Sequence, residues 1–89
     1  GFPYRTLEEE GIFLPVIEAY VEYIKPIRYD ERVRIRTRGS LQGVRVRMDY
    51  ELVRDGEVVA RGYTVHACLN RERRPVRPPR KLRDALGLI

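Results

Sequence analysis

Alternating apolar and polar residues fill the middle of the chain and predict an antiparallel sheet. Apolar or β-branched residues occupy every second position in residues 16–24, 32–38 and 44–52. A period of two is that of a strand with one buried face. A fourth strand is expected after residue 56, because Asp55-Gly56 tolerates the positive φ angles of a two-residue type I′ hairpin turn.

The same hairpin turn sets a register for the last two strands. Counting outward from it places Leu52 opposite Val59 on one apolar face of the sheet. That register puts Thr64 and His66 on the other, arginine-bearing face. A loop over residues 39–43 is expected to join the second and third strands.

Short helices are expected at the two ends of the chain. Residues 6–9 have capping-box spacing, and Gly11 is suitably placed to end a helix of about one turn. Residues 78–80, Pro-Pro-Arg, favour the start of a second short helix. Its apolar side, at i, i+3, i+4 and i+7, consists of Leu82, Ala85, Leu86 and Ile89.

These two helices are too short to cover the predicted sheet. Four strands of this length present an apolar face on the order of 500 Å², which is more than a soluble monomer usually leaves open. A curved antiparallel sheet needs a longer helix or a partner chain on that face. We therefore expect residues 1–89 to be one N-terminally incomplete domain, completed by an upstream segment or by a tight oligomer.

Charge is distributed unevenly along the 89 residues. The net charge is +5, yet residues 1–70 hold eleven basic and eleven acidic side chains. Residues 71–89 hold seven basic groups against Glu72 and Asp84, so the whole excess lies in this last segment. A basic segment of this kind makes nucleic acid and phosphorylated ligands candidate partners.

Several classes of protein and site are excluded by the residues that the sequence lacks. No apolar run approaches the roughly 20 residues that span a bilayer, so stable membrane insertion is not expected. Cys68 is the only cysteine and His66 the only histidine, which excludes a cysteine cluster and a multi-histidine metal site within one chain. We expect no metal or other cofactor, and a reducing, cytoplasmic setting.

Taken in order, the turn, glycine and proline positions resemble one known family, the 4-hydroxybenzoyl-CoA-thioesterase-like branch of the hot-dog fold. The resemblance covers nearly all 89 residues. No single motif is specific to the family, but the order and spacing of the motifs are. Its residues are Gly1, Tyr4, Leu7-Glu8-Glu9, Gly11 and Leu14-Pro15-Val16; Tyr23, Pro26 and Arg28-Tyr29-Asp30; Tyr50 and Arg54-Asp55-Gly56; Gly62, Thr64 and His66; and Arg74-Pro75, Arg77 and Pro79.

The resemblance implies an α+β fold in which a curved antiparallel sheet wraps around one central helix. Most of that helix and the first strand would lie upstream of Gly1. The implied activity is hydrolysis of an acyl-CoA thioester to the free acid and CoA, at the interface of a homodimer or homotetramer. A carboxylate would act on water or on the thioester, while helix N-terminal N–H groups polarise the carbonyl.

The resemblance also indicates which residues serve the site. The family's catalytic carboxylate lies in a motif like Asp-x-x-Gly-x-x-His, which this sequence lacks, so the catalytic residue is unknown and expected upstream of Gly1. Arginine offers planar, bidentate donors to phosphate, and the candidate CoA ligands follow the last strand. They are Arg71, Arg73, Arg74 and Arg77. Thr64 and His66 are expected to support the site rather than to catalyse.

Other interpretations of the same residues remain open. The arginines after residue 70 could form a solvated tail, and residues 75–80 fit a PxxPxR ligand of an SH3 groove. The arginine row in residues 32–38 could bind a nucleic-acid backbone, although acidic residues on neighbouring strands are expected to neutralise it. A different hot-dog activity, on an acyl-carrier-protein thioester or as a hydratase, is the remaining enzymatic alternative.

Overall fold

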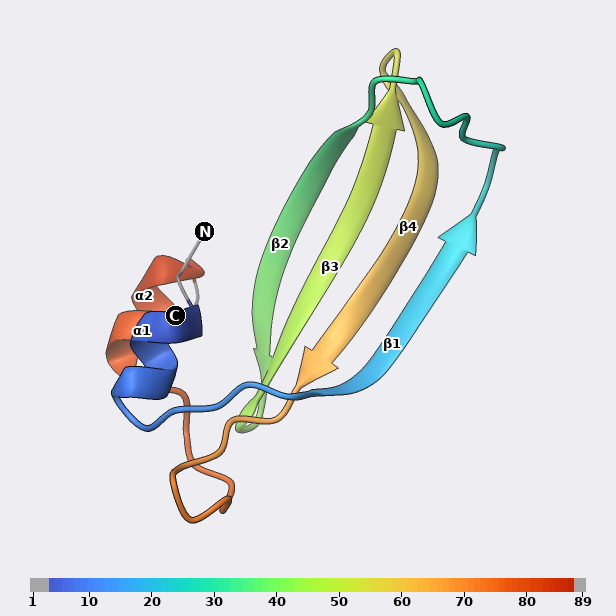
Figure 1. The fold of residues 1–89 in the computed structure, drawn as a ribbon. Coiled ribbons are helices and arrows are strands. Elements are labelled where there is room, and N and C mark those ends of the chain that lie inside the picture. The colour runs from blue at the N-terminus through green and yellow to red at the C-terminus, as the bar shows by residue number, and fades with distance from the viewer. Residues whose placement is uncertain (1–3, 88–89) are drawn as a thin grey trace.

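The computed structural model describes residues 4–87 and contains one curved antiparallel sheet flanked by two short helices (Figure 1). The strand order is β1-β4-β3-β2, so β1 and β2 form the edges. Four antiparallel strands between short terminal helices are what the alternation predicted. In chain order the elements are α1 (Tyr4–Glu9), β1 (Val16–Tyr23), β2 (Arg34–Gln42), β3 (Arg45–Arg54), β4 (Glu57–His66) and α2 (Arg80–Ala85).

Two tight turns connect β2, β3 and β4. Asp55 and Gly56 have φ angles of 52° and 78°, which confirms the predicted type I′ turn. The loop predicted over residues 39–43 is wrong, because β2 continues through Gly39 and pairs with β3 as far as Gln42. Gly43, with φ of 64°, starts the turn.

A β-bulge follows the type I′ turn and shifts the register of β4. Val53 pairs with Val58, as counting from the turn predicts, but Leu52 pairs with Ala60. Val59 is therefore the extra residue, and it is fully buried. The predicted pairing of Leu52 with Val59 is wrong by one residue, and alternation alone gave no signal for the bulge.

The bulge moves the rest of β4 to the opposite face from the one predicted. His66 pairs with Val46 and Thr64 with Met48, so both lie on the apolar face of the sheet. Tyr63, which the predicted register places opposite Met48 on the apolar face, pairs instead with Asp49 on the arginine-bearing face. A one-residue slip reverses the face of every side chain because strand side chains alternate with a period of two. This correction brings the two predicted supporting residues to the apolar side.

The first helix ends as predicted but starts earlier. Gly11, with φ of 82°, donates its N–H to the Glu8 carbonyl at 3.0 Å, and Ile12 donates to the Leu7 carbonyl at 2.8 Å. This pair of bonds is a Schellman motif, which satisfies the last carbonyls of a helix. Because α1 already includes Thr6, this residue is not the N-cap that capping-box spacing predicted.

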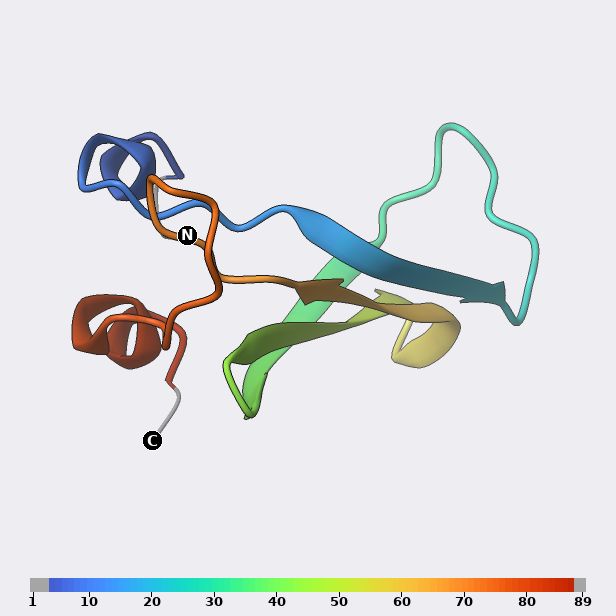
Figure 2. The same ribbon diagram turned by 90° about the horizontal axis from the view of Figure 1, so that it is seen from below.

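Both helices pack together at one end of the sheet rather than across it (Figures 1 and 2). Leu7 of α1, Leu82 of α2 and Val46 of β3 are buried against one another. Neighbouring apolar side chains complete this cluster: Ile12, Leu14, Leu41, Met48 and Leu86. Leu82 and Leu86 lie on the apolar side predicted for α2, but Ala85, predicted on the same side, is exposed. Ile89 lies outside the described residues. Within residues 4–87 no helix is long and apolar enough to cross a membrane.

The far end of the apolar face is open in the structure. Ile35 is 64% exposed, Val21 61% and Tyr23 71%, although all three point to the same face as the buried Val46. The two helices reach only the end of the sheet near the Gly43 turn, because each has six residues. The prediction that these helices leave much of the sheet face uncovered is confirmed.

Gly62 of β4 lies directly against the backbone of β1. A Cβ atom at this position would lie against the carbonyl oxygen of Tyr20, closer than real Cβ atoms approach a backbone atom. Gly62→Ala is therefore expected to lower the free energy of unfolding by about 1–3 kcal/mol, measured by urea denaturation, because β1 must move. The matched control is Gly39→Ala, where the new Cβ would meet Leu86 and Met48 at 3.4 Å. Equal losses for the two variants would contradict this explanation.

Candidate functional site

The loop that follows β4 is held in one shape by Asn70. Its side-chain oxygen accepts the backbone N–H groups of Glu72 and Arg74, each at 3.0 Å. Its backbone carbonyl accepts the N–H of Arg73, and its own N–H donates to the Arg74 carbonyl. Arg73 is left with φ of 60°, a conformation that non-glycine residues rarely adopt. Strain of this kind persists where the surrounding structure fixes it, often at functional sites.

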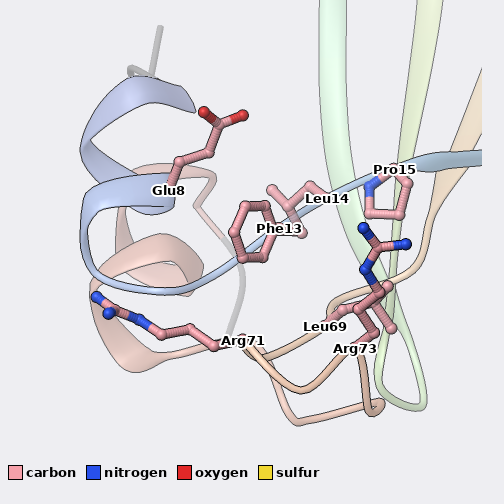
Figure 3. A pocket seen from close by; sticks show the side chains of 7 residues that line it. All are labelled: Glu8, Phe13, Leu14, Pro15, Leu69, Arg71 and Arg73. Atoms are coloured by element: carbon pink, nitrogen blue, oxygen red, sulfur yellow. The ribbon is translucent and has the colours of Figure 1, made fainter.

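This loop forms one wall of a pocket of about 490 Å³ (Figure 3). The opposite wall is the segment between α1 and β1, and the two are joined where Phe13 and Leu69 exchange backbone hydrogen bonds of 2.9 Å. Seven residues line the pocket: Glu8, Phe13, Leu14, Pro15, Leu69, Arg71 and Arg73. Phe13, 38% exposed, gives it an aromatic surface.

The two arginines of this pocket have different surroundings. Arg71 donates from Nη2 to the Glu9 carbonyl at 3.0 Å and lies across Gly11, so its guanidinium caps the end of α1. The Arg71 guanidinium extends away from Arg73, toward the end of α1 (Figure 3). The guanidinium of Arg73 extends toward Pro15 along the opposite rim. Arg73 is thus the arginine best placed to meet an anion in the pocket.

The other two arginines predicted to bind CoA lie outside the pocket lining. Arg74 and Arg77 are exposed on the same basic segment. The SH3-ligand interpretation of this segment is contradicted, because Pro78 is fully buried and cannot contact a partner's groove. Phe13 belonged to no predicted motif, and only its position beside Leu14-Pro15 could have drawn attention to it.

A chain of hydrogen bonds crosses the apolar face and ends at the pocket. The Tyr50 hydroxyl lies 3.1 Å from Oγ1 of Thr64, which lies 2.9 Å from Nε2 of His66. Nδ1 of His66 lies 3.1 Å from the carbonyl oxygen of Leu14, a pocket residue. His66 is 5% exposed. The predicted supporting residues, Thr64 and His66, are therefore in direct contact, and Tyr50 joins them.

Residues 4–87 show neither a metal site nor an exposed cysteine. No group of three histidine, cysteine, aspartate or glutamate side chains lies close enough together there to hold a metal ion. Cys68 is buried, and burial raises the pKa of its thiol, so the thiolate is scarce at neutral pH. Cys68 therefore has the surroundings of an inert thiol.

The arginine-bearing face of the sheet, opposite the apolar face, carries both basic and acidic side chains. Arg36 pairs with Glu51 at 3.5 Å across β2 and β3, as the neutralisation argument predicted. Arg47 donates to both oxygens of Asp49 and stacks 4.0 Å above the Tyr63 ring. Ion pairing on this face reduces the positive field that a nucleic-acid backbone would need.

Comparison with known proteins gives a consistent result over nearly the whole chain. Residues 1–86 match the family model described as the thioesterase-like superfamily. A 1,4-dihydroxy-2-naphthoyl-CoA hydrolase of Synechococcus elongatus is 32% identical over 80 residues, which are 88% of this chain. The chain spans 59% of the length of that curated relative.

Solved structures extend the similarity to three dimensions. A hypothetical protein from Thermus thermophilus matches with a TM-score of 0.81 and 32% identity, over 96% of this chain and 66% of the other. A DHNA-CoA thioesterase from Staphylococcus aureus matches with a TM-score of 0.78 and 32% identity, over 96% of this chain and 59% of the other.

Proposed function

Because this chain belongs to the thioesterase-like superfamily and has its hot-dog fold, we propose that the protein hydrolyses acyl-CoA thioesters to the free acid and CoA. The observation that carries the proposal is the pocket beside the basic loop, joined by hydrogen bonds to the apolar face of the sheet. Acyl-CoA has a charged nucleotide at one end and an apolar acyl group at the other, which matches these two surfaces. The predicted cytoplasmic setting suits this substrate.

Within the proposed site, the pocket would hold the nucleotide end of CoA. Arg73 would form charge-assisted hydrogen bonds with a phosphate, and Phe13 would stack on adenine. Arg71 would contribute mainly by fixing the pocket wall, because its guanidinium caps α1. Arg74 and Arg77 would add long-range positive charge from outside the pocket lining.

The acyl group would then extend along the apolar face of the sheet. We propose that in the intact protein this face is covered by a further segment upstream of Gly1, which carries the catalytic carboxylate, in a homodimer or homotetramer. Two observations support this proposal. The far end of the face is open around Ile35, and the curated relative is longer than this chain.

Adenosine 3′,5′-bisphosphate, a fragment of CoA without the acyl arm, tests the nucleotide pocket by itself. In an NMR titration we expect the backbone amide signals of Phe13, Leu69 and Arg73 to shift in a saturable way, since these residues line the pocket. The hairpin at residues 54–57, at the other end of the sheet, is the internal control and should not shift. Shifts confined to the arginines of β2, or none at millimolar ligand, would contradict the assignment of the pocket.

A further inference from the structure

The arginine-bearing face of the sheet carries a row of charged residues that alternate in sign. The row crosses the sheet at one level, because each member pairs with the member on the next strand. From β1 to β2 its members are Glu22, Arg61, Glu51 and Arg36. Arg36 and Glu51 form an ion pair of 3.5 Å, yet their side chains remain 59% and 47% exposed. The row therefore leaves charge open to a partner, with an acidic end at β1 and a basic end at β2.

A row of this order is complementary to its own reverse. A second copy, given a half-turn about an axis parallel to the strands, lays its β1 over β2 and its β4 over β3. Glu22 then faces the partner's Arg36, and Arg61 faces the partner's Glu51, so every charge of the row meets an opposite charge. A half-turn about an axis across the strands would instead lay β1 on β1 and β2 on β2, which brings like charges together.

The neighbouring row on the same face adds an aromatic contact. It contains Tyr20, Tyr63, Asp49 and Arg38, in order from β1 to β2. The Tyr20 and Tyr63 rings stack with their centroids 5.7 Å apart, and Tyr20 is still 49% exposed. The same half-turn lays Tyr20 against the partner's Arg38, a pair suited to a cation–π contact. Facing sheets pack about 10 Å apart, a gap that side chains of this length can bridge.

From these two rows we infer that the arginine-bearing face is a symmetric interface with a second copy of this chain. The contact leaves the apolar face untouched, so it is compatible with a further segment on that side. It specifies one interface of the homo-oligomer proposed above and does not depend on the proposed activity. A nucleic-acid backbone fits this face less well, because half of the charged row is acidic.

Two double variants of opposite charge test this interface on the intact protein as its gene encodes it. Arg36→Glu with Arg61→Glu makes the row wholly acidic, and Glu22→Arg with Glu51→Arg makes it wholly basic. We expect sedimentation velocity to give half the wild-type particle mass for each variant alone, because like charges then face one another. Mixed in equal amounts, the two variants should regain the wild-type mass, since acidic rows then meet basic rows.

Further variants separate the interface from general effects of charge and folding. Arg77→Glu with Arg80→Glu makes the same change in net charge at exposed positions outside the sheet, and it should keep the wild-type mass. Circular dichroism shows first whether each variant is folded. If four like charges unfold the sheet, Arg61→Gln and Glu51→Gln are compared instead. Each should weaken association about tenfold, because the symmetry removes two ion pairs at once.

The possible outcomes separate this inference from the proposed function. A monomeric wild type, or folded double variants that keep the wild-type mass, would overturn the interface. Loss of mass in both variants without recovery on mixing would overturn it as well, since the pairing of acidic with basic rows would be wrong. Recovery on mixing would support the interface even if the protein released no thiol from acyl-CoA, a result that would count against the proposed activity alone.

Discussion

Replacing Arg73 with glutamine is expected to raise the KM for acyl-CoA about 10- to 100-fold, with kcat changed less than about twofold. The reason is that the Arg73 guanidinium is the one that faces the pocket while that of Arg71 caps α1. A phosphate contact remote from the reacting thioester contributes binding that is equal in the ground state and the transition state. Steady-state kinetics on the intact protein measure both constants.

Two comparisons make the Arg73 prediction specific. Arg34→Gln, which removes an exposed arginine of β2 far from the pocket, is the matched control and should leave KM unchanged. An acyl-pantetheine substrate lacks the nucleotide, so Arg73→Gln should not affect its hydrolysis. If the variant impaired acyl-pantetheine as strongly as acyl-CoA, Arg73 would be acting on the fold rather than on a phosphate. If it impaired neither, an acyl-carrier-protein substrate would become the better explanation.

Replacing Ile35 with aspartate is expected to destabilise the intact protein by about 3 kcal/mol or more. In the structure Ile35 is 64% exposed, and a charge at such a position would ordinarily change the free energy of unfolding by less than about 0.5 kcal/mol. The large effect is expected only because we propose that another segment or subunit covers this face. Chemical denaturation of the intact protein measures the difference.

The control for the Ile35 prediction is another exposed aliphatic residue outside the face. Val44, 43% exposed, lies in the β2–β3 turn, and Val44→Asp should cost little. A loss for Ile35→Asp no larger than that for Val44→Asp would mean that the face stays open, and the proposed covering segment would have to be abandoned.

Most of the fold could be predicted from sequence, and the main error comes from one extra residue in β4. Period-two alternation and Asp55-Gly56 predicted the strands and one hairpin, since both depend on neighbouring residues. The bulge at Val59 depends instead on how β4 packs at the end of the sheet, and apolar alternation looks the same with or without it. That single extra residue reversed the predicted faces of Thr64 and His66.

The candidate site was also predicted only in part, because its side-chain contacts depend on packing between distant segments. The basic segment identified Arg71 and Arg73, because charge clusters are visible in sequence. The sequence did not show that the Arg71 guanidinium donates to the Glu9 carbonyl at the end of α1. Nor did it show that Arg74 lies outside the pocket lining. Phe13 was missed, and Tyr50 was noted only as part of the family resemblance and not as a partner of Thr64. An aromatic residue in a strand or before one is ordinarily interpreted as part of the core.

Release of CoA thiol from acyl-CoA is the measurement that tests the proposed activity most directly. The intact protein, with any residues that its gene encodes before Gly1, is assayed with aliphatic and aromatic acyl-CoAs using a thiol reagent. We expect thiol release proportional to enzyme concentration, with kcat/KM of at least about 10⁴ M⁻¹ s⁻¹ for the best substrate. A folded protein that releases no thiol above the spontaneous rate from any acyl-CoA would contradict the proposal that this chain serves thioester hydrolysis.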